Sequence, residues 1–178
     1  MMEVKIVDNF LPKKELDELK YLIEESGEFP FYFQSIVAAQ KGVTTTDKER
    51  LDIRKQYWNW YQIHGLYRDG QPCSEYCEPI CDMFIPRFKG LQSLLRVKVN
   101  FYPYTRKIRE HLPHRDTNFK HTAAIFSLNT CDGFTRMENG SKVSSVENRI
   151  VFFDGSTSHN SSTTTTASAR LNINFNFL

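Results

Sequence analysis

The feature that most constrains the fold is the strict alternation of polar and apolar residues near the end of the chain. From Arg170 to Phe177 the sequence reads RLNINFNF. Successive side chains of a β-strand point to opposite faces, so the pattern predicts a strand with one arginine and three asparagines on one face. The four apolar side chains then share the other face. A helix, with its period of 3.6 residues, would mix the two sets.

Apolar residues in the first half of the chain follow a different period. After Leu11-Pro12, leucines recur at helical spacing until Gly27 and Pro30 interrupt the pattern, which predicts a helix over this stretch. A short strand is expected before it, from Val4 to Val7. The segment 34–56 has only weak periodicity and is predicted to be a surface loop.

A second helix is expected after Gly70, with three cysteines (Cys73, Cys77 and Cys81) at intervals of four residues along one face. Pro79 falls inside this pattern and should kink or divide the helix. The cysteine spacing suggests one of two things: a binding motif for a metal ion or metal cluster, or thiols that are buried in the core. The second interpretation is favoured, because the spacing matches no cluster signature and free cysteine is among the most buried residue types.

From Leu94 onward the apolar period is 2, and further strands are predicted at 96–102, 121–129, 143–146 and 149–153. Helices followed by strands are typical of an α+β domain. We expect the strands to form a double-stranded β-helix, that is a jelly-roll or cupin-like barrel, with the N-terminal helices packed on one sheet. At 178 residues, the whole chain (1–178) is expected to be a single domain.

The charge balance bears on the class of function, and the N-terminal sequence bears on the cellular compartment. The 23 basic and 21 acidic side chains give a formal net charge of +2, which lacks the one-sided basic field of a dedicated nucleic-acid binder. The start of the chain lacks the pattern of a signal peptide, and no apolar run is long enough to cross a bilayer. The sequence therefore predicts a cytoplasmic protein with reduced thiols, and it gives no oligomeric state.

A metal site is suggested by the triplet His114-Arg115-Asp116. If the triplet lies on a strand, the imidazole and the carboxylate project to the same side. His159, after the strand predicted at 149–153, offers a third ligand. Two histidines and one carboxylate with open positions form the facial triad of non-haem Fe(II) oxygenases. His111 extends the motif to HxxHxD and leaves a rival ligand assignment open.

A triplet of this kind occurs by chance in many soluble chains, so two further features carry weight. Arg170 lies eleven residues after His159 on the polar face of the last strand, where its guanidinium could bind the distal carboxylate of a 2-oxo acid. Asn100 and Tyr102 share one face of an earlier strand and could bind the same anion. Tyr104 would continue that row if the strand persisted past Pro103.

With these motifs in place, the chain resembles the 2-oxoglutarate/Fe(II)-dependent oxygenases, and most of all their small prolyl-4-hydroxylase-like branch, including members carried by marine phages. The resemblance spans most of the chain and rests on the following segments: VKIVDNFLPKKELDELK (4–20), NFYPY (100–104), HRD (114–116), TAAIFSLN (122–129), GFTRMENG (133–140), NRIVFFDGSTSH (148–159) and ARLNINF (169–175). Many relatives carry Arg-x-Ser in the last strand, whereas this chain has Arg170-Leu171-Asn172. Collagen-type prolyl hydroxylases usually have lysine in place of Arg170.

The resemblance implies an Fe(II)- and 2-oxoglutarate-dependent dioxygenase, with iron held by His114, Asp116 and His159. Arg170, Asn100, Tyr102 and Asn172 would bind 2-oxoglutarate. With O2, the cosubstrate would be converted to succinate and CO2. A C–H bond of an amino-acid or peptidyl substrate, with a prolyl residue among the candidates, would be hydroxylated. Ascorbate would support turnover.

Two alternatives stay open at the level of the sequence. One is a non-redox cupin-like module that binds a metal or small ligand. The other is an oxygenase that acts on alkylated nucleic acid, against which the near-neutral charge counts modestly.

Overall fold

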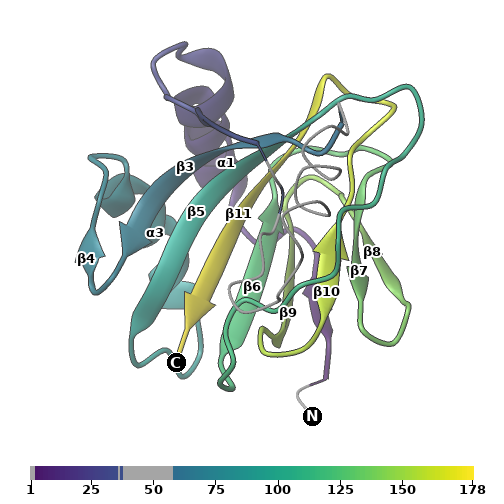
Figure 1. The fold of residues 1–178 in the computed structure, drawn as a ribbon. Helices are drawn as coiled ribbons and strands as arrows, with labels where there is room; N and C mark the ends of the chain where they lie inside the picture. Colours follow the sequence, from purple (N-terminus) through teal and green to yellow (C-terminus); the bar gives the residue numbers. More distant parts are fainter. Residues whose placement is uncertain (1–2, 36, 38–57) are drawn as a thin grey trace.

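The computed structural model describes residues 3–35, 37 and 58–178, shown in Figure 1. The predicted surface loop at 34–56 lies almost entirely outside these described residues. No helix of the described part is long and apolar enough to cross a membrane.

In the described part of the chain, eleven strands build two antiparallel sheets. The large sheet consists of β1 (Lys5–Val7), β2 (Tyr32–Gln34), β3 (Tyr61–Arg68), β4 (Gln71–Pro72), β5 (Leu94–Pro103), β6 (Thr122–Ser127), β9 (Arg149–Asp154) and β11 (Ala169–Phe177). Its order is β1-β9-β6-β11-β5-β3-β2, with β4 beside β3. The small sheet, in the order β10-β7-β8, consists of β7 (Phe134–Met137), β8 (Lys142–Ser144) and β10 (His159–Ser161).

The first predicted helix is confirmed and the second starts later than predicted. Helix α1 (Lys13–Lys20) continues into a π-helical turn, η1 (Tyr21–Glu25). Helix α3 (Cys77–Phe84) is followed by a 3-10 turn, η2 (Ile85–Arg87). Cys73 is exposed and precedes the helix, so its predicted place on the helix face was wrong. Pro79 lies in the first turn, where a missing N–H breaks no helical hydrogen bond, so α3 runs through it unbroken.

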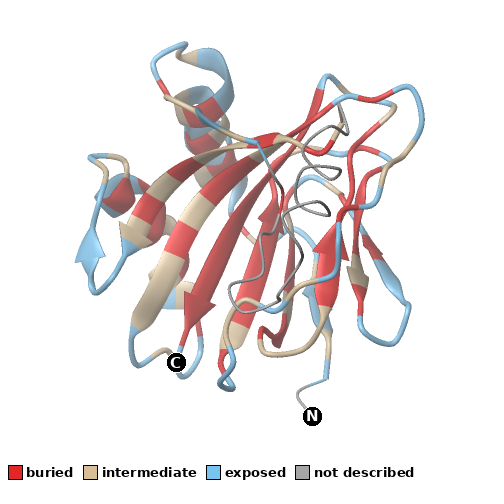
Figure 2. Ribbon diagram, viewed as in Figure 1, coloured by how far each residue is buried: buried red, intermediate tan, exposed pale blue. Residues whose placement is uncertain are grey.

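The main core lies between the helices and one face of the large sheet. The apolar side chains of β11 all belong to it, as the alternation predicted. Phe84 of α3 packs on the sheet, with its ring centroid 4.9 Å from that of Phe126 and 4.7 Å from that of Phe175. Figure 2 shows β11 buried along its whole length. A central strand is covered on both faces, which explains why its polar residues are buried too.

The opposite face of the large sheet faces the small sheet (Figure 1). On β5 and β11 this face carries the polar side chains. In register across β11 and β5, Arg170 lies opposite Tyr102 and Asn172 lies opposite Asn100. Two facing antiparallel sheets with helices on the outer face of one confirm the predicted jelly-roll fold. Among the described residues, the strands form two separate sheets rather than one closed, hydrogen-bonded barrel.

Candidate metal centre and anion site

The two candidate histidine ligands are held side by side by the backbone. His114 and His159 form an isolated antiparallel bridge, and each donates its N–H to the other's carbonyl oxygen at 2.9 Å. Their ring centroids are 4.5 Å apart. The triplet 114–116 is therefore not part of a regular strand, which corrects the basis of the prediction. A non-local bridge to β10, rather than strand parity alone, aligns the side chains.

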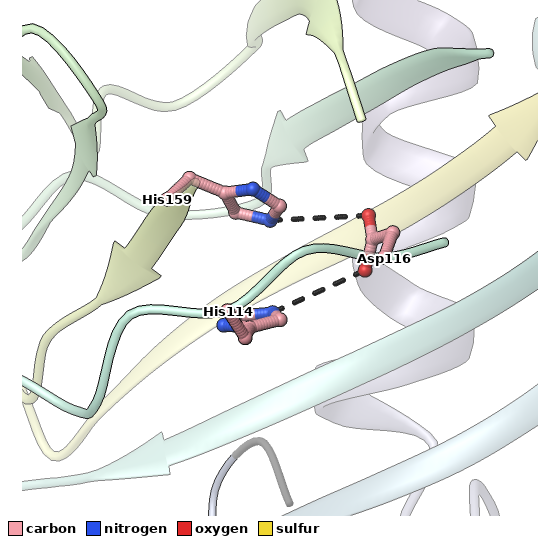
Figure 3. Close-up of side chains that lie close together, drawn as sticks. All are labelled: His114, Asp116 and His159. Atoms are coloured by element: carbon pink, nitrogen blue, oxygen red, sulfur yellow. Dashed lines mark ion pairs between the residues drawn. The ribbon is translucent and has the colours of Figure 1, made fainter. Parts of the chain in front are cut away.

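Asp116 completes the group, and Figure 3 shows the three side chains converging. Its backbone N–H donates to the carbonyl oxygen of Gly155 at 3.0 Å. One carboxylate oxygen accepts from Nη2 of Arg96 at 2.6 Å, and the other accepts from Nδ2 of Asn176 at 2.8 Å. The carboxylate is thus fixed from two strands of the large sheet, β5 and β11.

The donor atoms fit one metal ion. Nε2 of His114 lies 4.0 Å from one oxygen of Asp116, and Nε2 of His159 lies 3.8 Å from the other. These separations are too long for hydrogen bonds. Cis ligands with bonds of about 2.1 Å lie about 3.0 Å apart, so small shifts of the side chains would bring the three ligand atoms onto one ion. Nδ1 of His159 lies 3.0 Å from the carbonyl oxygen of Thr157 and can donate to it, which leaves Nε2 as the ligand atom.

The electrostatics suit a cation. Burial raises the pKa of Asp116, but nearby cationic groups, Arg96 foremost, lower it more, so the net pKa lies below the ordinary value. Burial and the neighbouring His159 lower the pKa of His114 to about 4. Asp116 is therefore ionised and His114 neutral near pH 7, which are the protonation states that metal binding requires.

Arg170 forms the second part of the site and is fully buried, with 1% of its surface exposed. Its Nη2 donates to Oγ1 of Thr135 at 2.9 Å and its Nε to Oγ of Ser145 at 3.2 Å. The guanidinium carbon lies 5.5 Å from the ring centroid of Tyr102. No carboxylate of the described residues pairs with it, and an unpaired buried charge is costly. The surroundings of Arg170 are therefore suited to an anion.

The remaining predicted residues lie on the same sheet face, with Tyr102 opposite Arg170 and with Asn172 and Asn100 one step nearer to Asn176 along the strand pair. Asn100 donates through Nδ2 to Oδ1 of Asn172 at 2.8 Å, and Oδ1 of Asn100 is buried without a hydrogen-bond partner. Tyr102 is buried and stacks on His111. His111, the rival ligand, hydrogen-bonds through Nδ1 with Oγ of Ser161 at 2.8 Å and lies outside the group of candidate ligands.

Sequence reasoning missed some residues of the site and misplaced one. Tyr104 is 52% exposed and does not continue the row of Asn100 and Tyr102. Arg96 shares the parity of Asn100 on β5, so the alternation of that strand could have drawn attention to it. Its contact with Asp116 depends on how two distant segments meet, which the sequence does not display.

No protein-family model matches the sequence, and no curated protein matches it. Solved structures do match over nearly the whole chain. A prolyl-4-hydroxylase from Pseudomonas putida has a TM-score of 0.58 at 18% identity, with 98% of this chain and 91% of that chain covered. An oxidoreductase of the 2OG-Fe(II) oxygenase family from Burkholderia pseudomallei has a TM-score of 0.64 at 12% identity, with 98% and 84% covered.

A prolyl hydroxylase from Trichoplax adhaerens, solved with a peptide fragment of the oxygen degradation domain of hypoxia inducible factor, has a TM-score of 0.60 at 16% identity. The match covers 98% of this chain and 83% of that chain. The specific likeness to phage proteins stays a prediction. The chain has the fold of the 2OG-Fe(II) oxygenases, the prolyl hydroxylases among them.

Proposed function

We propose that the protein is an Fe(II)- and 2-oxoglutarate-dependent dioxygenase that hydroxylates a C–H bond of an amino-acid or peptidyl substrate. The observation that carries the proposal is the pairing of two sites on one polar sheet face. The first is a cluster of two imidazoles and a carboxylate whose ligand atoms lie within 4.8 Å of one another. The second is a buried guanidinium, Arg170, that pairs with no carboxylate of the described residues.

The metal would be held by Nε2 of His114, Nε2 of His159 and the carboxylate of Asp116. Three protein ligands leave open positions at a six-coordinate ion, as the facial triad requires. When bound, Fe(II) together with 2-oxoglutarate and O2 supplies the oxidising chemistry, and succinate and CO2 are released. The protein's own contribution is to bind the metal and the cosubstrate, to orient them, and to keep water away from them. Arg96 and Asn176 hold the carboxylate of Asp116 in place while it binds the metal.

Arg170 would bind the distal carboxylate of 2-oxoglutarate with its planar, multiply donating guanidinium. Thr135 and Ser145 fix the orientation of that guanidinium. Asn172 and Asn100 face each other on the same sheet face, between Arg170 and Asn176 along β11, and would contact the middle of the cosubstrate. The ring of Tyr102 lies against the guanidinium and would exclude water from this end of the site.

The class of substrate is inferred from the structural neighbours. Two of the three neighbours described above are named prolyl hydroxylases, and one of these was solved with a peptide. Amino-acid and peptidyl side chains, prolyl among them, are therefore the first candidates. Ascorbate is expected to sustain turnover by keeping the iron reduced. We expect no nucleic-acid substrate, in line with the formal net charge of +2.

The proposal is tested by titrating 2-oxoglutarate into the Fe(II)-loaded protein without oxygen, followed by calorimetry and by the visible difference spectrum. Wild type should bind 2-oxoglutarate only when metal is present. Arg170→Met should weaken that binding about tenfold or more, because a charge-assisted bidentate contact is lost. Its affinity for the metal should stay close to that of wild type, since Arg170 touches no candidate ligand.

Arg68→Met is the matched control, because this side chain is 73% exposed at the end of β3. If Arg170→Met fails to fold, Thr135→Val is the substitute, since it removes only the oxygen that accepts from Nη2 of Arg170. Binding of 2-oxoglutarate that is unchanged in the Arg170 variants, or that does not depend on metal, would reject the assignment. In that case a non-redox binding module becomes the better account.

A further inference from the structure

Lys98 occupies the same polar sheet face as the candidate site and has no role in the function proposed above. It lies on β5 between Arg96 and Asn100, points to the same face as both of them, and is directly opposite Asn174 of β11. The side chain is half-buried, and its Nζ lies 5.6 Å from the ring centroid of Tyr61. Lys98 therefore presents an ammonium to the interior between the two sheets, next to the metal group.

The ammonium of Lys98 has no acidic partner among residues 3–35, 37 and 58–178. Its neighbour Arg96 pairs with Asp116 at 2.6 Å, whereas no carboxylate of these residues lies within ion-pair distance of Lys98. Burial and the nearby Arg96 lower the pKa of Lys98 to about 8, and Asp116 opposes them. The amine is thus still mostly protonated at neutral pH. An ammonium that is partly desolvated and has no acidic partner is stabilised when an anion joins it.

The charges on this face lead to the same conclusion. Among the polar residues of β5 and β11 on this face, three are cations (Arg96, Lys98 and Arg170), and the one anion that contacts these two strands at the site is Asp116. Fe(II) and the 2-oxoglutarate dianion cancel each other, so binding both of them leaves the excess of two positive charges in place. Arg96 is occupied by Asp116, and Arg170 would be occupied by the cosubstrate. The unsatisfied cation closest to the metal group is then Lys98.

A hydrogen-bond acceptor adjoins the ammonium. Asn174 is 6% exposed, and its Oδ1 is buried without a hydrogen-bond partner in the described structure. Because Asn174 faces Lys98 across the strand pair, a donor and an unused acceptor stand side by side. A group with an anionic oxygen and a neighbouring N–H or O–H matches this pair. A free amino acid has both, whereas a prolyl residue inside a peptide has neither.

We propose that the substrate of this site carries a free carboxylate, which pairs with Lys98 beside the metal, and that Lys98 thereby determines substrate specificity. The inference rests on the proposed function, because it assumes that the metal and 2-oxoglutarate occupy their sites. It favours small acids and free amino acids over the interior of a peptide chain. All of these substrates carry a free carboxylate. A peptide whose C-terminal residue is the one that reacts also carries one, so it would bind in the same way.

The test uses protein loaded with Mn(II) and 2-oxoglutarate, in which the metal is paramagnetic but drives no turnover. The probe is acetate, with neutral acetamide of the same shape as its control, and the readout is the relaxation rate of the probe's methyl protons. Acetate should show a saturable enhancement with wild type and acetamide should not. Lys98→Met should weaken acetate binding about tenfold or more, and Lys98→Arg should retain most of it.

Lys13→Met, at a lysine whose side chain is 81% exposed on α1, controls for the loss of one charge. Calorimetry of 2-oxoglutarate binding is run on every variant, and circular dichroism checks folding. Acetate binding that is absent in wild type, or equal in wild type and Lys98→Met, overturns the inference. So does a loss of 2-oxoglutarate binding in Lys98→Met, since Lys98 would then serve the cosubstrate.

The two proposals fail in different ways. If wild type binds no 2-oxoglutarate at all, the proposed function fails and the inference falls with it. If 2-oxoglutarate binds and acetate does not, only the specificity assigned to Lys98 is wrong.

Discussion

Asp116 is the most firmly held of the three candidate ligands. Arg96 and Asn176 each donate to one of its oxygens, and Nδ2 of Asn176 also lies 3.2 Å from Nε2 of His121. These contacts come from residues that are far from Asp116 in the sequence. They orient the carboxylate toward the two imidazoles, which is the role that outer partners of metal ligands usually have.

Removing the guanidinium of Arg96 should therefore weaken metal binding. We expect Arg96→Met to lose about 10–100-fold in Mn(II) affinity, measured by anaerobic calorimetry, because the carboxylate becomes free to rotate. Arg115→Met is the control, since the Arg115 side chain is 58% exposed and its Nη2 lies 3.9 Å from Glu138. Equal metal affinities in the two variants would show that Arg96 does not position the ligand.

The buried histidines make the metal-free protein sensitive to acid. Burial and the charge of Arg170 lower the pKa of His111 to about 3, and burial and His159 lower that of His114 to about 4. In the unfolded chain both have a pKa of about 6.5. Below that pH the unfolded state binds more protons, so the free energy of unfolding falls as the pH drops toward the folded pKa values. The slope is about 1.4 kcal/mol per pH unit for each histidine.

Urea unfolding of the metal-free protein at a series of pH values below 6.5 measures this slope. In His111→Phe the slope should be smaller by the equivalent of about one proton. A slope that matches wild type would mean that His111 is not kept neutral by the fold.

At the scale of elements, β11 is the strand that links the core to the site, because one of its faces belongs to the core and the other to the site. The apolar face packs against the helices, and the polar face carries the anion site. Alternation is a local property of the chain, so β5, β11 and the faces of their side chains were predictable from the sequence. Which residues of β5 meet which residues of β11 is set by register between distant segments. The pairing of Arg96 with Asp116 was not predictable either, because Asp116 lies outside both strands and its segment is placed by the bridge between His114 and His159.

Local patterns failed at two further places for physical reasons. Cys73 has the spacing of the helix face, but β4 occupies the preceding residues and the helix starts only at Cys77. His114 and Asp116 owe their alignment to the bridge with His159 and not to a strand of their own. The three ligand candidates were nevertheless the correct residues to bring together. Their role as metal ligands stays a prediction.

The packing of α3 on the large sheet gives a test of the core. Phe84 is fully buried against Phe126 and Phe175. Phe84→Ala should lower the free energy of unfolding by about 3–5 kcal/mol, since it removes buried contacts and leaves a cavity. Urea denaturation measures this, with Tyr21→Ala, at a side chain 62% exposed, as a control expected to change little. A loss similar to that of the control would contradict the described packing.

The turn before β7 gives a test of the anion site that leaves the metal ligands untouched. A Cβ at Gly133 would lie 2.6 Å from Cδ of Arg170 and 3.0 Å from the carbonyl oxygen of Thr163. Because the carbonyl cannot move cheaply, Gly133→Ala should displace Arg170. We expect 2-oxoglutarate binding to weaken about tenfold, with metal affinity unchanged, as measured by calorimetry.

Gly65→Ala is the matched control for this variant, since its Cβ would make an ordinary contact of 3.6 Å with Sγ of Cys73. If both glycine variants bind 2-oxoglutarate equally well, the guanidinium is not confined as described.

At the scale of the whole molecule, both sheets contribute residues to the site. The large sheet supplies Arg170 and the supports of Asp116, while β10 of the small sheet supplies His159. The jelly-roll fold follows from helices placed before strands and from the change of period at Leu94. The chain positions one polar face of a sheet between two layers, and every residue proposed to bind metal, cosubstrate or substrate lies on or beside that face.

The most direct test of the central claim is succinate formation by anaerobically purified protein given Fe(II), 2-oxoglutarate and ascorbate, and then exposed to air. We predict that wild type forms succinate even without a known substrate and that His114→Ala, assayed in the same way, forms none. Absence of succinate from wild type, or equal amounts from wild type and His114→Ala, would contradict the assignment of an oxygenase centre at His114, Asp116 and His159.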